Sequence, residues 1–187
     1  RKNHAFLIDV LSKLSDEYHL VLAGPTLTDR DLVPGLRKDE IPTLNERAKT
    51  LGIADRLTIT PGFVDMETYL AAADVFCFPA EQEGMGTPLL ESIAAGVPVV
   101  ANGDESSFRE WITEGKNGYL RSLDGEQWAE AIVRASNTED LQKRNMSDQI
   151  KSIVSTDSID SDYEKILSAL ISSGKGEQID IAEILAI

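Results

Sequence analysis

The sequence predicts an α/β fold in which helices cover a parallel sheet, and two observations carry this prediction. Short apolar runs of strand length alternate with longer segments whose apolar residues recur at helical spacing. Three of these runs end at a glycine or a proline, as buried strands do where they enter a turn. Alternation of this kind is typical of β-α-β units, whose strands lie parallel in one sheet.

The elements follow from the pattern in chain order. Residues 4–17 form the first expected helix, because their apolar side chains recur at three- and four-residue intervals. Strands are expected at residues 19–23, 56–60, 74–79 and 97–101. Helices are expected at residues 42–51, 66–73, 88–95, 106–113, 125–135, 138–150 and 160–172. A polar excursion fills residues 26–39, and Cys77, which alternates with two phenylalanines, is expected in the core.

The chain changes character near residue 135, where the strong apolar patterning ends. We therefore expect one domain over residues 1–136 and a helical tail over residues 137–187, with a Ser/Asp-rich joint at residues 155–162. The last expected helix places four large side chains on one face, Tyr163, Ile166, Leu167 and Leu170, and the apolar pattern continues from Ile179 to Ile187. Little of this domain is left for that face to cover, so we expect it to pack loosely or to find a neighbouring molecule.

Composition excludes several classes of protein. The chain has 187 residues with 18 basic and 32 acidic side chains, and its net charge of −14 argues against a nucleic-acid partner. No apolar run approaches the roughly 18 residues of a membrane span, and no apolar signal segment follows the first charged residues. One cysteine excludes an internal disulfide, and two histidines exclude a His-rich metal cluster. The chain starts with Arg rather than Met, so we expect an excised or truncated domain.

The loop after the strand that ends near Phe78 is the main candidate site, because parallel sheets bind ligands at the carboxyl ends of their strands. This loop runs through Gly84 and Gly86, which allow positive φ and a close approach by a ligand. Thr87 and Pro88 suit the N-cap and the first position of the helix that follows. A helix N-terminus favours phosphate through its N–H groups and its dipole, so an anion site is expected here.

Two carboxylates bracket this expected anion site. Glu83 precedes the glycines and Glu91 lies one turn into the helix, where each can accept hydrogen bonds from sugar hydroxyls. Exposed charges are the rule on protein surfaces, so two solvated carboxylates are the alternative interpretation of the pair. The sequence contains no dinucleotide fingerprint, no Walker A motif and no G-x-S-x-G nucleophile motif.

The spacing of Glu83 and Glu91 resembles the E-x7-E motif of the retaining GT-B glycosyltransferases in the "glycosyl transferases group 1" family. Other segments resemble motifs of that family in the same order. They are Lys2-Asn3 before a helix, V-L-A-G-P at 21–25, L-G-I at 51–53, Y-L-A-A-A-D-V at 69–75, E-S-I-A-A-G-V-P-V-V-A at 91–101 and G-K-N-G at 115–118. The resemblance covers residues 2 to about 135, and several ordered motifs are more specific than one pair of glutamates.

The resemblance implies a Rossmann-like parallel sheet with helices on both faces, which is the C-terminal half of a GT-B fold with its first strand missing. Glu83 would be the catalytic residue and contact the donor sugar near the reacting carbon, and Glu91 would bind ribose hydroxyls. Lys2 would neutralise the leaving diphosphate as the bond breaks. Backbone at Phe63 and Val64 would meet the base. The other donor-binding residues it implies are Gly24, Gly84, Met85, Gly86, Thr87, Pro88 and Leu89.

The resemblance also implies a function, that of a hexosyltransferase-type enzyme which binds a nucleoside-diphosphate sugar and transfers the sugar to an acceptor with retention. The acceptor domain would lie before this chain, so the fragment is expected to be inactive alone. No cofactor and no metal are expected. We expect a cytoplasmic protein, with peripheral membrane contact left open through the missing half. The alternatives are a non-catalytic nucleotide-sugar-binding module and a GT-B-type disaccharide phosphorylase domain.

Three features depart from the family pattern. Residues 102–107, N-G-D-E-S-S, replace the usual x-D-x-G-G stretch, which removes glycines and adds two carboxylates, Asp104 and Glu105, near the expected donor site. The arginine that pairs with the lysine of the family would fall upstream of Arg1. The polar excursion at residues 26–39 is longer than is typical.

Overall fold

The structure is a computed structural model, and it describes residues 2–24, 40–172, 180–181 and 185. The polar excursion expected at residues 26–39 and most of the chain after residue 172 lie outside these ranges. All other expected elements fall within them.

The strands of the described part run parallel, as predicted, and they pair in two groups. β1 (Leu20–Gly24) pairs with β2 (Leu57–Pro61), with Leu20 opposite Leu57 and Gly24 opposite Pro61. β3 (Phe76–Phe78), β4 (Val99–Asn102) and β5 (Gly118–Arg121) form a three-stranded sheet in the order β3-β4-β5. β5 was not expected from the sequence, because its four residues combine a glycine and an arginine with only two large apolar or aromatic side chains.

The helices lie close to their expected positions. They are α1 (His4–Leu11), α2 (Ile41–Thr50), α3 (Met66–Ala71), α4 (Thr87–Ala94), α5 (Gly125–Ser136), α6 (Asp140–Val154) and α7 (Thr156–Ser172). The helix expected at residues 106–113 is instead a short 3-10 helix, η2 (Ser106–Glu110), and a second, η1 (Ala54–Arg56), precedes β2. The expected joint at residues 155–162 is a break at Ser155, whose backbone is extended between α6 and α7.

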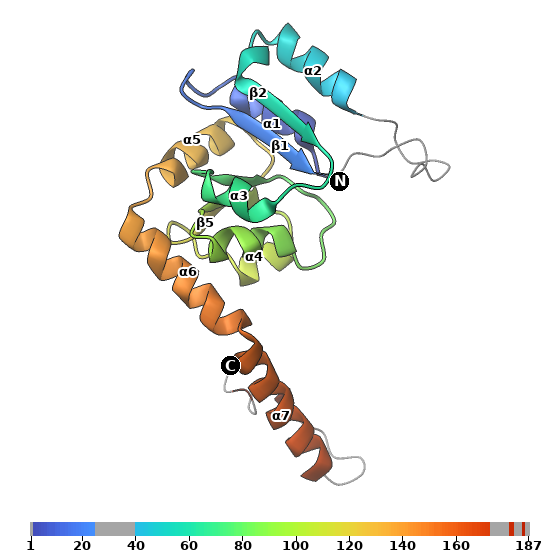
Figure 1. The fold of residues 1–187 in the computed structure, drawn as a ribbon, viewed down its shortest axis with the longest axis vertical. Helices are drawn as coiled ribbons and strands as arrows, with labels where there is room; N and C mark the ends of the chain where they lie inside the picture. The colour runs from blue at the N-terminus through green and yellow to red at the C-terminus, as the bar shows by residue number, and fades with distance from the viewer. Residues whose placement is uncertain (1, 25–39, 173–179, 182–184, 186–187) are drawn as a thin grey trace, which may run out of the picture.

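Helices cover both faces of the sheets (Figure 1). On one face, α1 and α5 bury Leu7, Val10, Trp128 and Ile132 against Val100 of β4. The same cluster includes side chains of both groups of strands, Leu20 and Leu22 of β1 and Val75 and Cys77 beside and within β3. The two sheets therefore share one layer under α1 and α5. β1 and β3 are edge strands of their sheets and do not pair with each other.

The other face is covered by α4, α6 and η2. Leu89 and Ile93 of α4 and Phe108 of η2 are fully buried there against Phe78 and Val99. Met146 and Ile150 of α6 belong to the same cluster, and Ser147 donates a hydrogen bond of 2.6 Å to the carbonyl of Ala94. α6 thus packs on the sheet domain, whereas α7 continues away from it and buries no residue (Figure 1).

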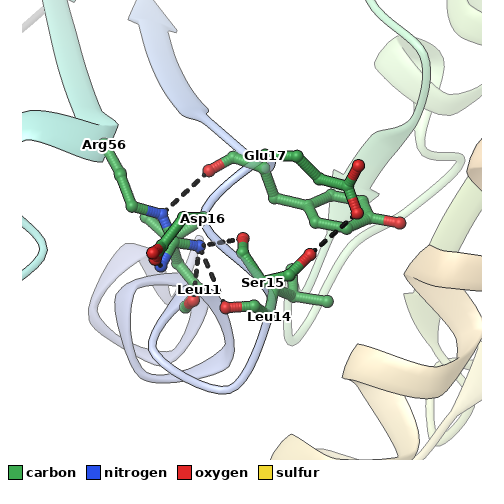
Figure 2. Close-up of polar contacts among 7 residues, drawn as sticks. Leu11, Leu14, Ser15, Asp16, Glu17 and Arg56 are labelled. Carbon is green, nitrogen blue, oxygen red and sulfur yellow. Dashed lines mark hydrogen bonds and ion pairs between the residues drawn. The ribbon is translucent and has the colours of Figure 1, made fainter.

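Arg56 explains why α1 ends at Leu11 rather than near residue 17 (Figure 2). Its guanidinium is 8% exposed and donates to the carbonyls of Leu11, Leu14, Ser15 and Tyr18 at 2.8–3.2 Å. Carbonyls at a helix end have no partner within the helix and need one elsewhere. Arg56 supplies that partner to the turn that follows α1.

Candidate functional site

The loop between β3 and α4 is shaped by two residues with positive φ, Gln82 (62°) and Gly86 (75°). Gly86 is the N-cap of α4, so Thr87 and Pro88 occupy the first two helical positions rather than the N-cap and first position that the sequence suggested. Two features of position 86 require a glycine. Its φ is unfavourable for other residues, and a Cβ would come within 2.9 Å of Cε1 of buried Phe108. Gly84, which the sequence indicated only as able to adopt positive φ, does not adopt it.

Lys2 and Glu83, 81 residues apart in sequence, meet at this loop. The Nζ atom of Lys2 lies 2.6 Å from Oε1 of Glu83, and it also lies 4.7 Å from the centroid of the Phe78 ring. The side chain of Glu83 is 11% exposed and that of Lys2 is 44% exposed. A charge-assisted hydrogen bond of this length at a largely buried carboxylate is stronger than an ordinary surface ion pair. The structure thus brings together two of the three charged groups that the resemblance assigned to the donor.

Glu105 holds the backbone of the same loop, a role that the sequence did not reveal. The N–H of Gln82 donates to its Oε1 at 2.6 Å, and the N–H of Glu83 donates to its Oε2 at 3.3 Å. The hydroxyl of Ser107 donates to the carbonyl of Glu83 at 3.4 Å. In the sequence, Glu105 is marked only by the departure from the family pattern at residues 102–107, which indicates added charge near the site and not a contact with the loop backbone.

The N-terminus of α4 offers an anion fewer backbone N–H donors than the five residues 85–89 that the resemblance implied. Pro88 has no N–H, and the N–H of Leu89 donates to the carbonyl of Gly86 at 2.8 Å. The side chain of Leu89 is fully buried, so it faces the core. The candidate anion donors are the amides of Met85, Gly86 and Thr87, of which Met85 is 55% exposed.

The other candidate residues lie on α4 and near the carboxyl ends of β1 and β2. Glu91 is an exposed residue in the second turn of α4. Gly24 ends β1 and its carbonyl accepts the N–H of Gly62 at 3.0 Å, which ties it to the turn after β2. Phe63 in that turn is 98% exposed, and Val64 is half-buried. Gly24, Phe63 and Val64 therefore lie at or just after the carboxyl ends of β1 and β2, while Glu83 follows the end of β3.

Other chemistries find less support. Among the residues that the structure describes, no group of three or more His, Cys, Asp or Glu side chains is placed to hold a metal ion. Burial raises the pKa of the Cys77 thiol to about 12, so this cysteine is not an activated nucleophile. The pKa of His4 is lowered, chiefly by burial and against the opposing effect of Glu40. The helices of the described ranges include none with the length and hydropathy to cross a membrane.

A second hollow, of about 510 Å³, lies at the opposite end of α4. It is lined by the ends of α3 and α4 and by both acidic and basic residues of α6, among them Asp140, Lys143 and Arg144. It lies away from Glu83 and is an alternative place at which a ligand could bind.

Known proteins resemble this chain over most of its length. The family model described as "Glycosyl transferases group 1" matches residues 1–138. A GDP-mannose-dependent alpha-(1-6)-phosphatidylinositol monomannoside mannosyltransferase of Mycobacterium tuberculosis is 35% identical over 96 residues, which are 45% of this chain and 25% of the relative.

Two solved structures share the fold. HepE from Anabaena, in complex with UDP, has a TM-score of 0.75 and 20% identity, and the match covers 90% of this chain and 45% of that one. The C-terminal domain of a glycosyl transferase group 1 family protein, LpcC from Francisella tularensis, has a TM-score of 0.63 and 22% identity, covering 82% of this chain and 79% of that one. The chain thus spans less than half of the mannosyltransferase and of HepE, but most of the isolated C-terminal domain.

Proposed function

Because the chain belongs to the glycosyl transferases group 1 family, we propose that it is the donor-binding half of a retaining GT-B glycosyltransferase. The donor is a nucleoside-diphosphate sugar, and the whole protein transfers the sugar to an acceptor held by a domain outside this chain. The observation that carries the proposal is the contact of Lys2 with Glu83 in the loop that joins the carboxyl end of β3 to the N-terminus of α4.

The site separates the tasks of donor binding among its parts. The amides of Met85, Gly86 and Thr87 at the N-terminus of α4 bind the diphosphate, since such an end carries N–H groups and positive dipole charge. Lys2 neutralises the charge that develops on the diphosphate when the glycosidic bond breaks. Its ammonium group has three donors, so Lys2 can bind phosphate and still contact Glu83.

The carboxylates act on the sugars of the donor. Glu83 contacts the transferred sugar near its reacting carbon, and Glu91 accepts hydrogen bonds from the ribose hydroxyls. Backbone at Phe63 and Val64 meets the base. We propose that no divalent metal takes part, because Lys2 and α4 supply positive charge where the phosphates bind. A cytoplasmic location stays a prediction.

Titration of the 187-residue chain tests this proposal. UDP, UDP-glucose, GDP and GDP-mannose are the probes, because one solved relative holds UDP and one relative is named as GDP-mannose-dependent. We expect saturable binding of one nucleoside diphosphate and of the corresponding nucleotide sugar. Their binding should change the NMR chemical shifts of Lys2, Glu83 and residues 85–87. Sugar transfer by the chain alone is not expected.

Two outcomes would contradict the proposal. If none of the four probes binds, the chain is not a donor-binding half. If a probe binds but shifts amides around Lys143 and Arg144 instead, the ligand occupies the hollow at the other end of α4 and the assigned site is wrong.

A further inference from the structure

Two successive amides of the β3–α4 loop converge on one carboxylate. Gln82 has a φ of 62°, a conformation that residues other than glycine adopt at a cost. With this backbone, the N–H groups of Gln82 and Glu83 both point at the carboxylate of Glu105, at 2.6 and 3.3 Å. Successive N–H groups arranged in this way form a concavity that binds anions. In this protein the anion is a side chain of the chain itself.

The segment that carries Glu105 is fixed in its turn. Asn102 at the end of β4 is buried, donates to the carbonyl of Ala80 at 3.2 Å and accepts the N–H of Asp104 at 3.1 Å. Arg109 donates to the carbonyl of Gly103 at 2.9 Å. Glu105 is therefore presented to the loop from a well-anchored turn rather than from a free surface strand.

Three groups of Glu83 are held by neighbouring side chains: its backbone N–H, its backbone carbonyl and its carboxylate. Its N–H is bound by Glu105 and its carbonyl by Ser107, while its side chain contacts Lys2. We infer that Glu105 is a positioning residue, which fixes the Glu83 loop in the geometry needed to contact the donor sugar. This inference rests on the proposed function of Glu83.

The filled concavity also directs where the phosphates bind. Because the amides of Gln82 and Glu83 are occupied by Glu105, an external anion is left with the amides at the start of α4. Glu105 thereby separates the sugar-contacting part of the loop from the phosphate-binding part. Loss of its carboxylate should affect binding of the sugar more than binding of the diphosphate.

The test compares three variants of the 187-residue chain. Glu105→Ala removes both acceptors, and Glu105→Gln keeps one carbonyl acceptor in the same shape and serves if the alanine variant does not fold. Asp104→Ala is the matched control, since it removes one negative charge from the neighbouring exposed position. Amide hydrogen exchange at Gln82 and Glu83 measures the contact directly. Calorimetry with UDP and UDP-glucose, or with GDP and GDP-mannose if the chain binds those, measures its effect.

We expect exchange at the two amides to accelerate by about tenfold or more in Glu105→Ala and less in Glu105→Gln, with no change in Asp104→Ala. Affinity for the nucleotide sugar should fall by about tenfold in Glu105→Ala, while affinity for the nucleotide stays within about twofold. A purely structural role would lower both affinities together.

Two results would contradict the role of Glu105, and a third would contradict the proposed function instead. Unchanged exchange at Gln82 and Glu83 would show that Glu105 does not hold the loop. Faster exchange with equal losses for nucleotide and nucleotide sugar would overturn the positioning role. If the unsubstituted chain binds no probe, the proposed function and the sugar contact both fail, and the exchange data alone then decide whether Glu105 holds the loop.

Discussion

Arg56 shows how a single charged residue can stabilise this fold from within. Its guanidinium is 8% exposed and donates to four backbone carbonyls of the turn after α1, whereas the Asp16 carboxylate at 3.3 Å is fully exposed and adds little (Figure 2). We expect Arg56→Ala to lower the free energy of unfolding by about 3 kcal/mol, because four hydrogen bonds of a buried charged donor are lost, although the carbonyls of Leu11 and Ser15 keep a backbone N–H partner. Chemical denaturation measures this difference.

Arg47 provides the control for Arg56. Its guanidinium forms a two-point contact with Asp9 at 2.6 and 2.5 Å, but both side chains are more than a third exposed. Exposed ion pairs contribute about 0–1 kcal/mol, so Arg47→Ala should cost far less than Arg56→Ala. Equal losses in the two variants would show that burial of Arg56 is not what matters.

At the scale of residues, sequence reasoning selected Lys2 and Glu83, and the structure places them in contact. It did so through a resemblance, since a lysine near a chain start and a loop glutamate carry no local signal of their own. Arg56 and Glu105 were not selected, because each acts on backbone groups of a distant segment. Contacts of a side chain with a distant backbone depend on the fold and leave no periodic pattern in the sequence.

At the scale of elements, Gly86 and Gly84 offer a matched pair of substitutions. Gly86→Ala forces a Cβ at φ 75° and within 2.9 Å of the Phe108 ring, whereas a Cβ at Gly84 meets no atom within 4 Å. We expect Gly86→Ala to lower the free energy of unfolding by about 2 kcal/mol or more, from backbone strain and the displaced ring. Gly84→Ala should leave stability within about 0.5 kcal/mol of the parent. Thermal unfolding of both variants checks this, and a larger loss at Gly84 would contradict it.

The strands that sequence reasoning found share a property that the missed strand lacks. β1 to β4 come from apolar runs bounded by turn residues, and β4 is buried along its whole length. β5 combines a glycine, two half-buried side chains and Arg121, so its sequence is not an apolar run. The helix expected at residues 106–113 became the 3-10 turn η2, whose single buried residue is Phe108. One apolar anchor does not define a helical stripe.

At the scale of the whole molecule, α6 and α7 differ in how they are held. α6 buries Met146 and Ile150, whereas Tyr163, Leu167 and Ile171 of α7 are 64%, 53% and 84% exposed. Most of the stability of helices in proteins comes from tertiary packing of an apolar face, and α7 buries no residue. In the dilute chain we expect α7 amides to exchange far faster than those of α5, as measured by hydrogen-deuterium exchange. Protection of α7 equal to that of α5 would show that another surface covers its apolar side chains.

The central claim is that Glu83 and Glu91 belong to one donor site with different tasks. Glu91→Ala should weaken both the nucleotide and the nucleotide sugar, because both contain ribose. Loss of hydrogen bonds to a carboxylate costs about 1.5–3 kcal/mol, or about 10- to 150-fold in affinity. Glu83→Ala should weaken the nucleotide sugar and leave nucleotide binding nearly unchanged.

The measurement is calorimetric titration of both variants and of Glu81→Ala, each with UDP and UDP-glucose or with the guanosine pair. Glu81→Ala controls for charge, because it removes an exposed carboxylate of the same loop, and loss of a negative charge near a dianion should by itself tighten binding slightly. We expect two different patterns of loss for Glu91 and Glu83 and none for Glu81. If Glu91→Ala and Glu83→Ala give the same pattern, or neither weakens binding, the two carboxylates do not have the separate tasks assigned to them and the central claim is wrong.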